Sequence, residues 1–167
     1  MSTRQIAYVG VLAALYVIIG QFTRYLPNPM GGGSTIALNM VVIVIAGILL
    51  GRVPGMLVGL VGTGLNALFT SGTGSGAFEL AAVIPHTIMG FSAGLARRAP
   101  AALAALTILV GHVLNLLAFV VARLLPFSEA TAFVFSAVLL VEVVIDVVVI
   151  SLVVPLLRPL VKQTAPE

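Results

Sequence analysis

Two acidic residues stand four positions apart inside a long apolar segment. Glu142 and Asp146 lie in the run from Thr131 to Leu157, which is long enough to cross a bilayer, since a helical span takes about 20 residues. Residues four apart share one face of a helix, so both carboxyl groups project to the same side. A carboxylate at that depth is costly unless it faces a partner or a water-filled cavity. The run therefore predicts a membrane helix whose acidic face is turned toward a polar protein interior.

The rest of the chain is nearly as apolar. Its mean hydropathy is +1.24 and only 8% of its 167 residues are charged, whereas soluble domains carry about a quarter. We therefore expect a single transmembrane domain over residues 1–167, embedded in a lipid bilayer, with its first apolar run retained as a span. The absence of cysteine excludes disulfides and thiolate metal sites. The high isoelectric point comes from a few basic residues at helix ends, so we expect no nucleic-acid partner.

Hydrophobic runs and their Pro and Gly boundaries predict an all-α integral membrane protein with six transmembrane helices. The expected helices cover residues 5–22, 35–50, 55–69, 77–96, 101–123 and 131–157. The second and third are short for a span, which indicates either thin, tilted packing or burial within the protein. Six of the eight basic residues fall on the side that holds both termini, so the charge bias predicts cytoplasmic termini. The Gly-rich loops at 27–34 and 71–76 then face outward.

Polar residues within the expected spans fall at matching depths. Helices joined by short loops are antiparallel, so residues equally far from a turn lie at one level. Counting from the expected turns places Asp146 level with His112, Glu142 with Asn115, and His112 with His86. Asn39 likewise comes level with Asn66. His112, Asn115 and Phe119 share one helix face, as do Glu79 and His86.

These levels predict a pocket that is lined by the second to sixth helices and opens outward. The candidate substrate-binding residues are Asn39, Asn66, Glu79, His86, Asn115, Phe119 and Glu142. His112 and Asp146 form a candidate structural or relay pair in the deepest layer.

Each candidate also has a simpler interpretation. Asn39 and Asn66 can simply form a hydrogen bond with each other across two helices, with no role in ligand binding. Glu79 can be an acid favoured by the dipole at the start of its helix. Glu142 and Asp146 would repel each other if both were ionised, so at least one is protonated or paired.

Catalytic and metal-site motifs are missing from the sequence. Two histidines and a few acids without a recognised spacing give only a weak metal signal, so we expect no metal and no cofactor. There is no GxSxG motif and no phosphate-binding loop with its lysine, so we expect no catalytic residues. The chain has no means of its own to hydrolyse ATP.

Small residues mark one face of the first helix, where Ala7, Gly10 and Ala14 can let another helix approach closely. With them, the chain resembles a substrate-binding S component of an energy-coupling factor (ECF) vitamin transporter along nearly its whole length. The residues that carry the resemblance are Arg4, Ile6 to Leu15, Asn39, Ala46 to Gly51, Pro54-Gly55, and Gly90 to Leu95 before Arg97-Arg98.

This resemblance implies a function as well as a fold. Such proteins have six helices, bind a vitamin or precursor near the outer surface, and hand it to a transmembrane subunit energised by two ABC ATPases. They dock through an AxxxA pattern on the first helix, for which Gly10-xxx-Ala14 stands in here. The resemblance thus implies a prokaryotic plasma-membrane importer subunit, not an enzyme, in which the 27–34 loop acts as a lid. The stretch from Gly72 to Leu80 is similar to that of S components for thiamine or its precursors, which favours a thiamine-related ligand.

Two other functions remain open from the residues alone. Intramembrane acids and histidines can form a proton relay, as in a solitary proton-coupled transporter or channel. The same groups could serve as acids and bases in an intramembrane enzyme, which ranks last because no nucleophile or metal motif accompanies them.

Overall fold

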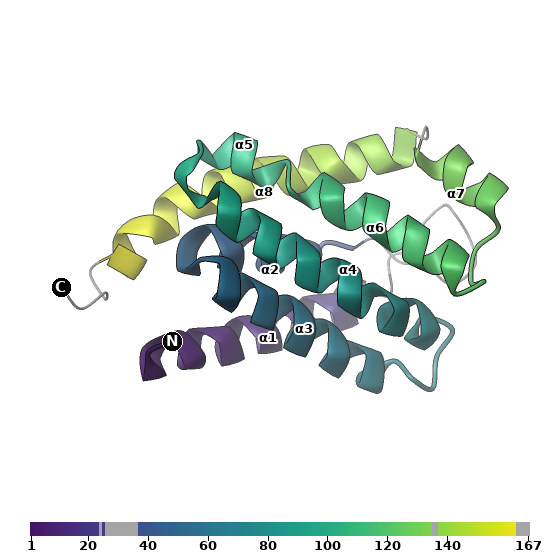
Figure 1. Cartoon of the computed structure of the whole chain (residues 1–167), viewed down its shortest axis with the longest axis horizontal. Coiled ribbons are helices and arrows are strands. Elements are labelled where there is room, and N and C mark those ends of the chain that lie inside the picture. The colour runs from purple at the N-terminus through teal and green to yellow at the C-terminus, as the bar shows by residue number, and fades with distance from the viewer. Residues whose placement is uncertain (24, 26–36, 135–136, 163–167) are drawn as a thin grey trace.

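The structure is a computed structural model that describes the whole chain except residues 24, 26–36, 135–136 and 163–167. The described residues form helices and connecting turns, with no strand among them (Figure 1). In chain order the elements are α1 (Thr3–Thr23), α2 (Met40–Leu50), α3 (Arg52–Phe69), α4 (Gly76–Leu95), the 3-10 turn η1 (Ala96–Arg98), α5 (Ala101–Ala105), α6 (Ile108–Val121), α7 (Phe127–Val134) and α8 (Ala137–Lys162).

Within the described residues, five segments are long and apolar enough to cross a membrane. They are α1, α3, α4 with η1, α5 with α6, and the part of α8 from Leu139 to Val161. The remaining apolar helix, α2, has only 11 residues. The helical membrane bundle is therefore confirmed, whereas α2 is too short to count as a sixth full span.

The predicted boundaries differ from the structure at several helix ends. α3 begins at Arg52 and not at 55, because Pro54 falls in its first turn, where no backbone donor is needed. The predicted helix 101–123 divides at Leu106–Thr107 into α5 and α6. The predicted helix 131–157 overlaps α7 and α8, which together begin earlier and end later, and residues 135–136 between them lie outside the described residues. The predicted start of the second helix at 35 lies outside the described residues, as does the 27–34 loop.

The turn that ends α6 comes a few residues before Ser128, the predicted centre of the last hairpin. Arg123 has a positive φ of 57°. The amide of Arg123 bonds to the carbonyl of Val120, and the amide of Leu124 bonds to that of Phe119. These two bonds are the Schellman pattern that ends a helix. Pro126 then follows, so the chain turns between Ala122 and Pro126 and not around Ser128.

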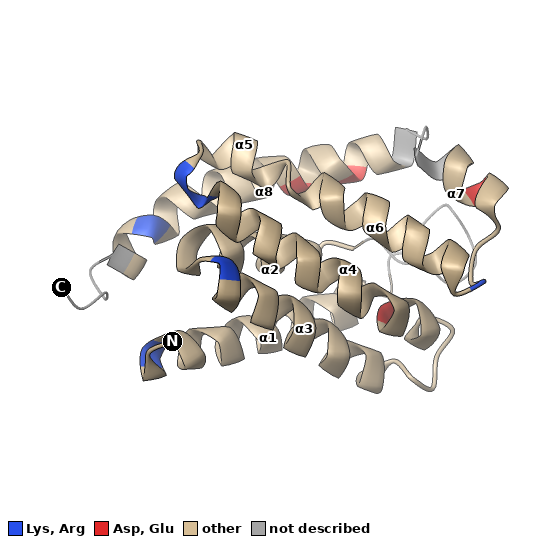
Figure 2. Cartoon of the chain, viewed as in Figure 1, with Lys and Arg blue, Asp and Glu red and all other residues tan. Residues whose placement is uncertain are grey.

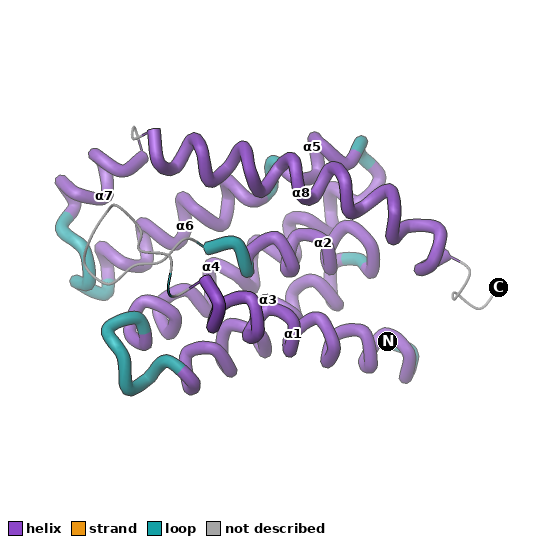
Figure 3. The backbone as a smooth tube through the Cα atoms, turned by 180° about the vertical axis from the view of Figure 1, so that it is seen from behind, coloured by secondary structure: helices purple, strands orange, loops and turns teal. Residues whose placement is uncertain are grey.

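α2 lies at the centre of the bundle. It contacts α1, α3, α4 and α8, and every residue from Met40 to Ile48 is buried. Figure 3 shows α2 from behind, between α1 and α8. A helix enclosed by protein does not need to span the bilayer, so burial accounts for its shortness.

Glycines bring α2, α3 and α4 into backbone contact. A methyl group at Gly55 of α3 would lie 2.5 Å from the carbonyl oxygen of Gly90 on α4 and 2.6 Å from the Cα of Gly47 on α2. At Gly59 it would lie 2.7 Å from the carbonyl carbon of His86. These distances are shorter than van der Waals contact, so the small residues of α3 serve packing within the bundle.

The charged residues divide between the two ends of the bundle. Figure 2 shows the basic residues gathered mainly where α1 begins and α8 ends, while acidic residues lie toward the middle and the opposite end. Both ends of the described chain lie on that basic side. This arrangement agrees with an even number of crossings.

Replacing Gly55 with alanine should destabilise the bundle, because the added methyl has backbone on two sides and no flexible side chain to displace. Overpacking of this kind costs about 1–3 kcal/mol. Thermal unfolding in detergent measures the change. Gly64→Ala on the same helix is the matched control, since nothing lies within 4 Å of a methyl group there. Equal unfolding temperatures for the two variants would contradict the contact.

Candidate functional site

His86 is the centre of a buried hydrogen-bonding cluster. Its Nδ1 atom lies 3.0 Å from the Tyr16 hydroxyl and 2.9 Å from the Thr63 hydroxyl. Its Nε2 atom lies 2.9 Å from Nδ2 of Asn115. The Tyr16 hydroxyl also lies 3.4 Å from a carboxylate oxygen of Glu79. Four helices, α1, α3, α4 and α6, therefore meet at one imidazole.

One tautomer of His86 gives a chain of hydrogen bonds through this cluster. With the proton on Nδ1, His86 donates to the Tyr16 oxygen, and Tyr16 donates in turn to Glu79. The bare Nε2 atom then accepts from the Asn115 amide. This assignment rests on the donor and acceptor inventory of the side chains. It gives the cluster one consistent direction, from Asn115 to the Glu79 carboxylate.

Tyr16 and Thr63 are parts of this cluster that the sequence interpretation missed. The sequence interpretation gives the small residues of the first helix a docking role and gives its other face none. The buried residues of α1 include Val9, Ala13, Tyr16 and Gly20, which share the face opposite the small residues. A polar-tipped aromatic on that face is the signal that could have identified Tyr16.

The two asparagines predicted to be level with each other lie on the same side of α1. A methyl group at Gly20 would lie 3.1 Å from Nδ2 of Asn39 and 2.9 Å from Nδ2 of Asn66. Asn66 accepts a hydrogen bond from Gln21 of α1 at 2.8 Å. Both amides are buried. The structure thus places Asn39 and Asn66 together beside α1. The partner of Asn66 in its hydrogen bond is Gln21 and not Asn39.

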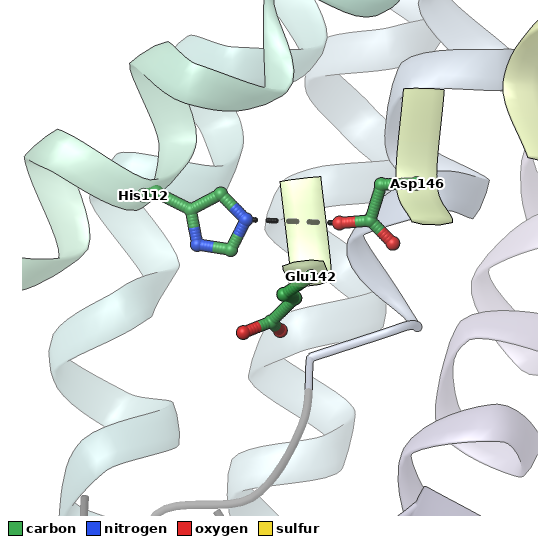
Figure 4. A group of neighbouring side chains, drawn as sticks. All are labelled: His112, Glu142 and Asp146. Atoms are coloured by element: carbon green, nitrogen blue, oxygen red, sulfur yellow. Dashed lines mark ion pairs between the residues drawn. The ribbon is translucent and has the colours of Figure 1, made fainter. Parts of the chain in front are cut away.

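A second buried cluster joins α6 and α8. The Nε2 atom of His112 lies 3.6 Å from Oδ2 of Asp146, so the two residues predicted to be level do face each other (Figure 4). Glu142 accepts a hydrogen bond from the backbone amide of Ala37 at 2.6 Å. The predicted level of Glu142 with Asn115 stays a prediction, and the structure gives the Glu142 carboxylate a backbone partner.

Phe119 and Glu79 lie toward the outer end of the bundle by the predicted orientation. Phe119 of α6 packs edge-on against Phe78 of α4, with ring centroids 5.1 Å apart. Glu79 lies in the first turn of α4, where the helix dipole favours an acid. Its carboxylate also accepts the hydrogen bond from Tyr16, so the two interpretations of Glu79 are compatible. An apolar groove of about 130 Å³ between α6 and α7 lies apart from both polar clusters, with Leu116, Val120 and Phe127 among its lining residues.

Tyr16→Phe should destabilise the bundle, because it removes both the acceptor for His86 and the donor to Glu79. Leaving buried polar groups with fewer partners costs about 1–3 kcal/mol. The unfolding temperature in detergent should fall. Tyr8→Phe is the control, since its hydroxyl meets Arg4 at the exposed end of the same helix. A fall of the same size in Tyr8→Phe would contradict the role of the cluster.

Taken together, an apolar helical bundle with histidines, acids and amides enclosed in its interior belongs to the class of membrane proteins that bind polar solutes. The family model for the ECF-type riboflavin transporter, S component, matches residues 1–162, and the chain belongs to this family. It is a membrane-embedded substrate-binding subunit of an ECF importer for a vitamin. No curated protein matches the chain, and no solved structure does.

The family membership decides between a transporter component and an enzyme. The predicted S component is confirmed, together with membrane transport of a vitamin. The family is a transporter component and not a family of enzymes. The roles of individual residues in ligand binding and docking stay predictions.

Proposed function

We propose that this S component captures its vitamin on the outer side of the membrane and passes it inward with partner subunits driven by ATP. The observation that carries the proposal is the family match over residues 1–162 together with the buried polar clusters of α4, α6 and α8. The basic end of the bundle supports cytoplasmic termini. The polar clusters then lie from mid-membrane toward the outer side.

The proposed ligand contacts are the residues predicted from the sequence: Asn39, Asn66, Glu79, His86, Asn115, Phe119 and Glu142. Their support is that five of the seven are polar side chains buried inside the bundle, namely Asn39, Asn66, His86, Asn115 and Glu142. Asn115 also keeps a buried Oδ1 atom with no hydrogen-bond partner among the described residues. That atom is available to a ligand donor.

Riboflavin is the first ligand to test, because the matching family is named for it. Its ring system carries amide-like donors and acceptors, which suit the asparagines and the imidazole. A thiamine-related molecule is the second candidate, because the half-buried Glu79 and the buried Glu142 suit a cationic or amine-bearing ring. Phe78 and Phe119 offer aromatic surface near the same end of the bundle.

Glu142→Gln should weaken vitamin binding while leaving the bundle folded. A hydrogen bond to a charged group contributes about 1.5–3 kcal/mol, so we expect a loss of affinity of roughly 10-fold or more. Quenching of riboflavin fluorescence measures it directly, and calorimetry measures thiamine on the same samples. Glu129→Gln is the matched control, because Glu129 lies exposed on α7. Unchanged affinity for whichever vitamin binds would remove Glu142 from the site.

The small-residue face of α1 is the proposed docking surface for the transmembrane subunit. Ala7, Gly10 and Ala14 are all exposed, and nothing lies within 4 Å of a methyl group added at Gly10. The opposite face of α1 packs into the bundle. The helix therefore offers a close-approach surface that the chain itself leaves uncovered.

Replacing Gly10 and Ala14 with leucine should impair assembly and spare vitamin binding, because the added side chains block close approach only on the outer face. Assembly is measured by a mild-detergent pull-down with mass spectrometry, in which the wild type should recover a transmembrane subunit and two ABC ATPases. Gly64→Leu on α3, which also has open space around it, is the control. Intact assembly in the double variant would reject this surface. Recovery of the wild type alone, even after crosslinking, would favour a solitary proton-coupled transporter.

A further inference from the structure

Three potential metal ligands converge between α6 and α8. One ligand atom from each of His112, Glu142 and Asp146 lies within 4.8 Å of the other two. Figure 4 shows the His112 ring facing the Asp146 carboxylate, with Glu142 beside the line that joins them. All three residues are buried. The site combines an imidazole nitrogen with two carboxylates.

The atoms that face this space lack hydrogen bonds. Asp146 has 0% of its side chain exposed, and neither of its carboxylate oxygens has a hydrogen-bond partner among the described residues. The same holds for Nε2 of His112. Buried polar atoms are nearly always paired, and His86 in the neighbouring cluster has both ring nitrogens engaged. Asp146 and His112 thus face each other only as an ion pair at 3.6 Å, and their buried atoms are available to bind a cation.

The spacing of the two side chains fits a shared cation better than a direct hydrogen bond. Their 3.6 Å separation exceeds the about 2.7–3.2 Å of a hydrogen bond from nitrogen to oxygen. Zinc bonds to imidazole nitrogen and carboxylate oxygen are about 2.0–2.2 Å long, so two ligands at a tetrahedral angle lie about 3.4 Å apart. A small inward movement of His112 or Asp146 would give this separation, and Glu142, within 4.8 Å of both, would close onto the same ion.

The charge of the two carboxylates also favours a bound cation. Two carboxylates beside an imidazole carry a formal charge of −2 when ionised, and a divalent cation neutralises it in an interior where isolated charges are costly. Imidazole with carboxylates suits zinc, cobalt, manganese or iron. The bond from the Ala37 amide to Glu142 is the kind of outer contact that orients a metal-binding carboxylate.

We propose that His112, Glu142 and Asp146 form a binding site for a divalent transition-metal ion inside the bundle. Three protein ligands leave a coordination position open, which water or a donor atom of the vitamin would fill. The site goes beyond vitamin capture, although it shares Glu142 with the proposed vitamin contacts. It also gives His112 and Asp146 a role other than a structural pair.

Metal binding by the full chain, without a histidine tag and without vitamin, tests the proposal. The chain is loaded with Zn²⁺ in detergent, desalted and analysed for bound metal, and Co²⁺ titration followed by visible absorption gives the affinity. We expect about one ion per wild-type chain. Asp146→Asn and His112→Gln should each lower the affinity by at least about 10-fold. Glu129→Gln, a substitution of the exposed acid on α7, should leave the metal affinity unchanged.

Several outcomes would overturn the site. A wild type that retains no metal, or variants that bind as tightly as the wild type, would do so. X-ray absorption at the zinc edge keeps the test valid if a variant fails to fold, because it uses the wild type alone. An imidazole and carboxylate shell supports the site, whereas oxygen ligands only would mean an adventitious ion. Since the metal is measured without vitamin, failure here leaves the riboflavin and thiamine measurements standing.

Discussion

The backbone contact between α3 and α4 is the constraint on which the rest of the structure depends. Gly59 of α3 lies against the backbone of His86, and Gly55 lies against that of Gly90. Because no Cβ separates the two helices there, Thr63 of α3 reaches the His86 ring at 2.9 Å. A side chain at these glycines would move α4 outward and separate the imidazole from its partners. The polar cluster around His86 therefore depends on the close packing of the small residues.

The buried polar groups fall into two clusters with different degrees of satisfaction. Around His86, the side chains of Tyr16, Thr63 and Asn115 meet both ring nitrogens. Around Asp146, buried oxygens stay without hydrogen bonds among the residues that the structure describes. Around His86 the one buried atom without a partner is Oδ1 of Asn115, among the residues that the structure describes. Paired polar groups stabilise the bundle in lipid, and unpaired ones are available to a ligand.

Much of the fold could be predicted from the sequence because apolar runs and their Pro and Gly boundaries are local signals. The same signals could not show that 101–123 divides at Leu106, or that the hairpin closes at Arg123, whose positive φ is an uncommon choice for arginine. Depth counted from turns brought His112 to Asp146. It could not show that Glu142 meets the Ala37 amide, because that amide lies before α2 and not in a neighbouring helix of the hairpin. Tyr16 was missed because its partners come from distant parts of the chain.

The two faces of α1 have a consequence for how binding and assembly influence each other. One face carries Tyr16 into the His86 cluster, and the other leaves Gly10 and Ala14 exposed. A rigid helix that shifts on one side shifts on the other, so α1 connects the interior to the proposed docking surface. Thermodynamic linkage makes any such coupling reciprocal. The factor by which bound vitamin changes the affinity for a partner on α1 must equal the factor by which that partner changes the affinity for the vitamin.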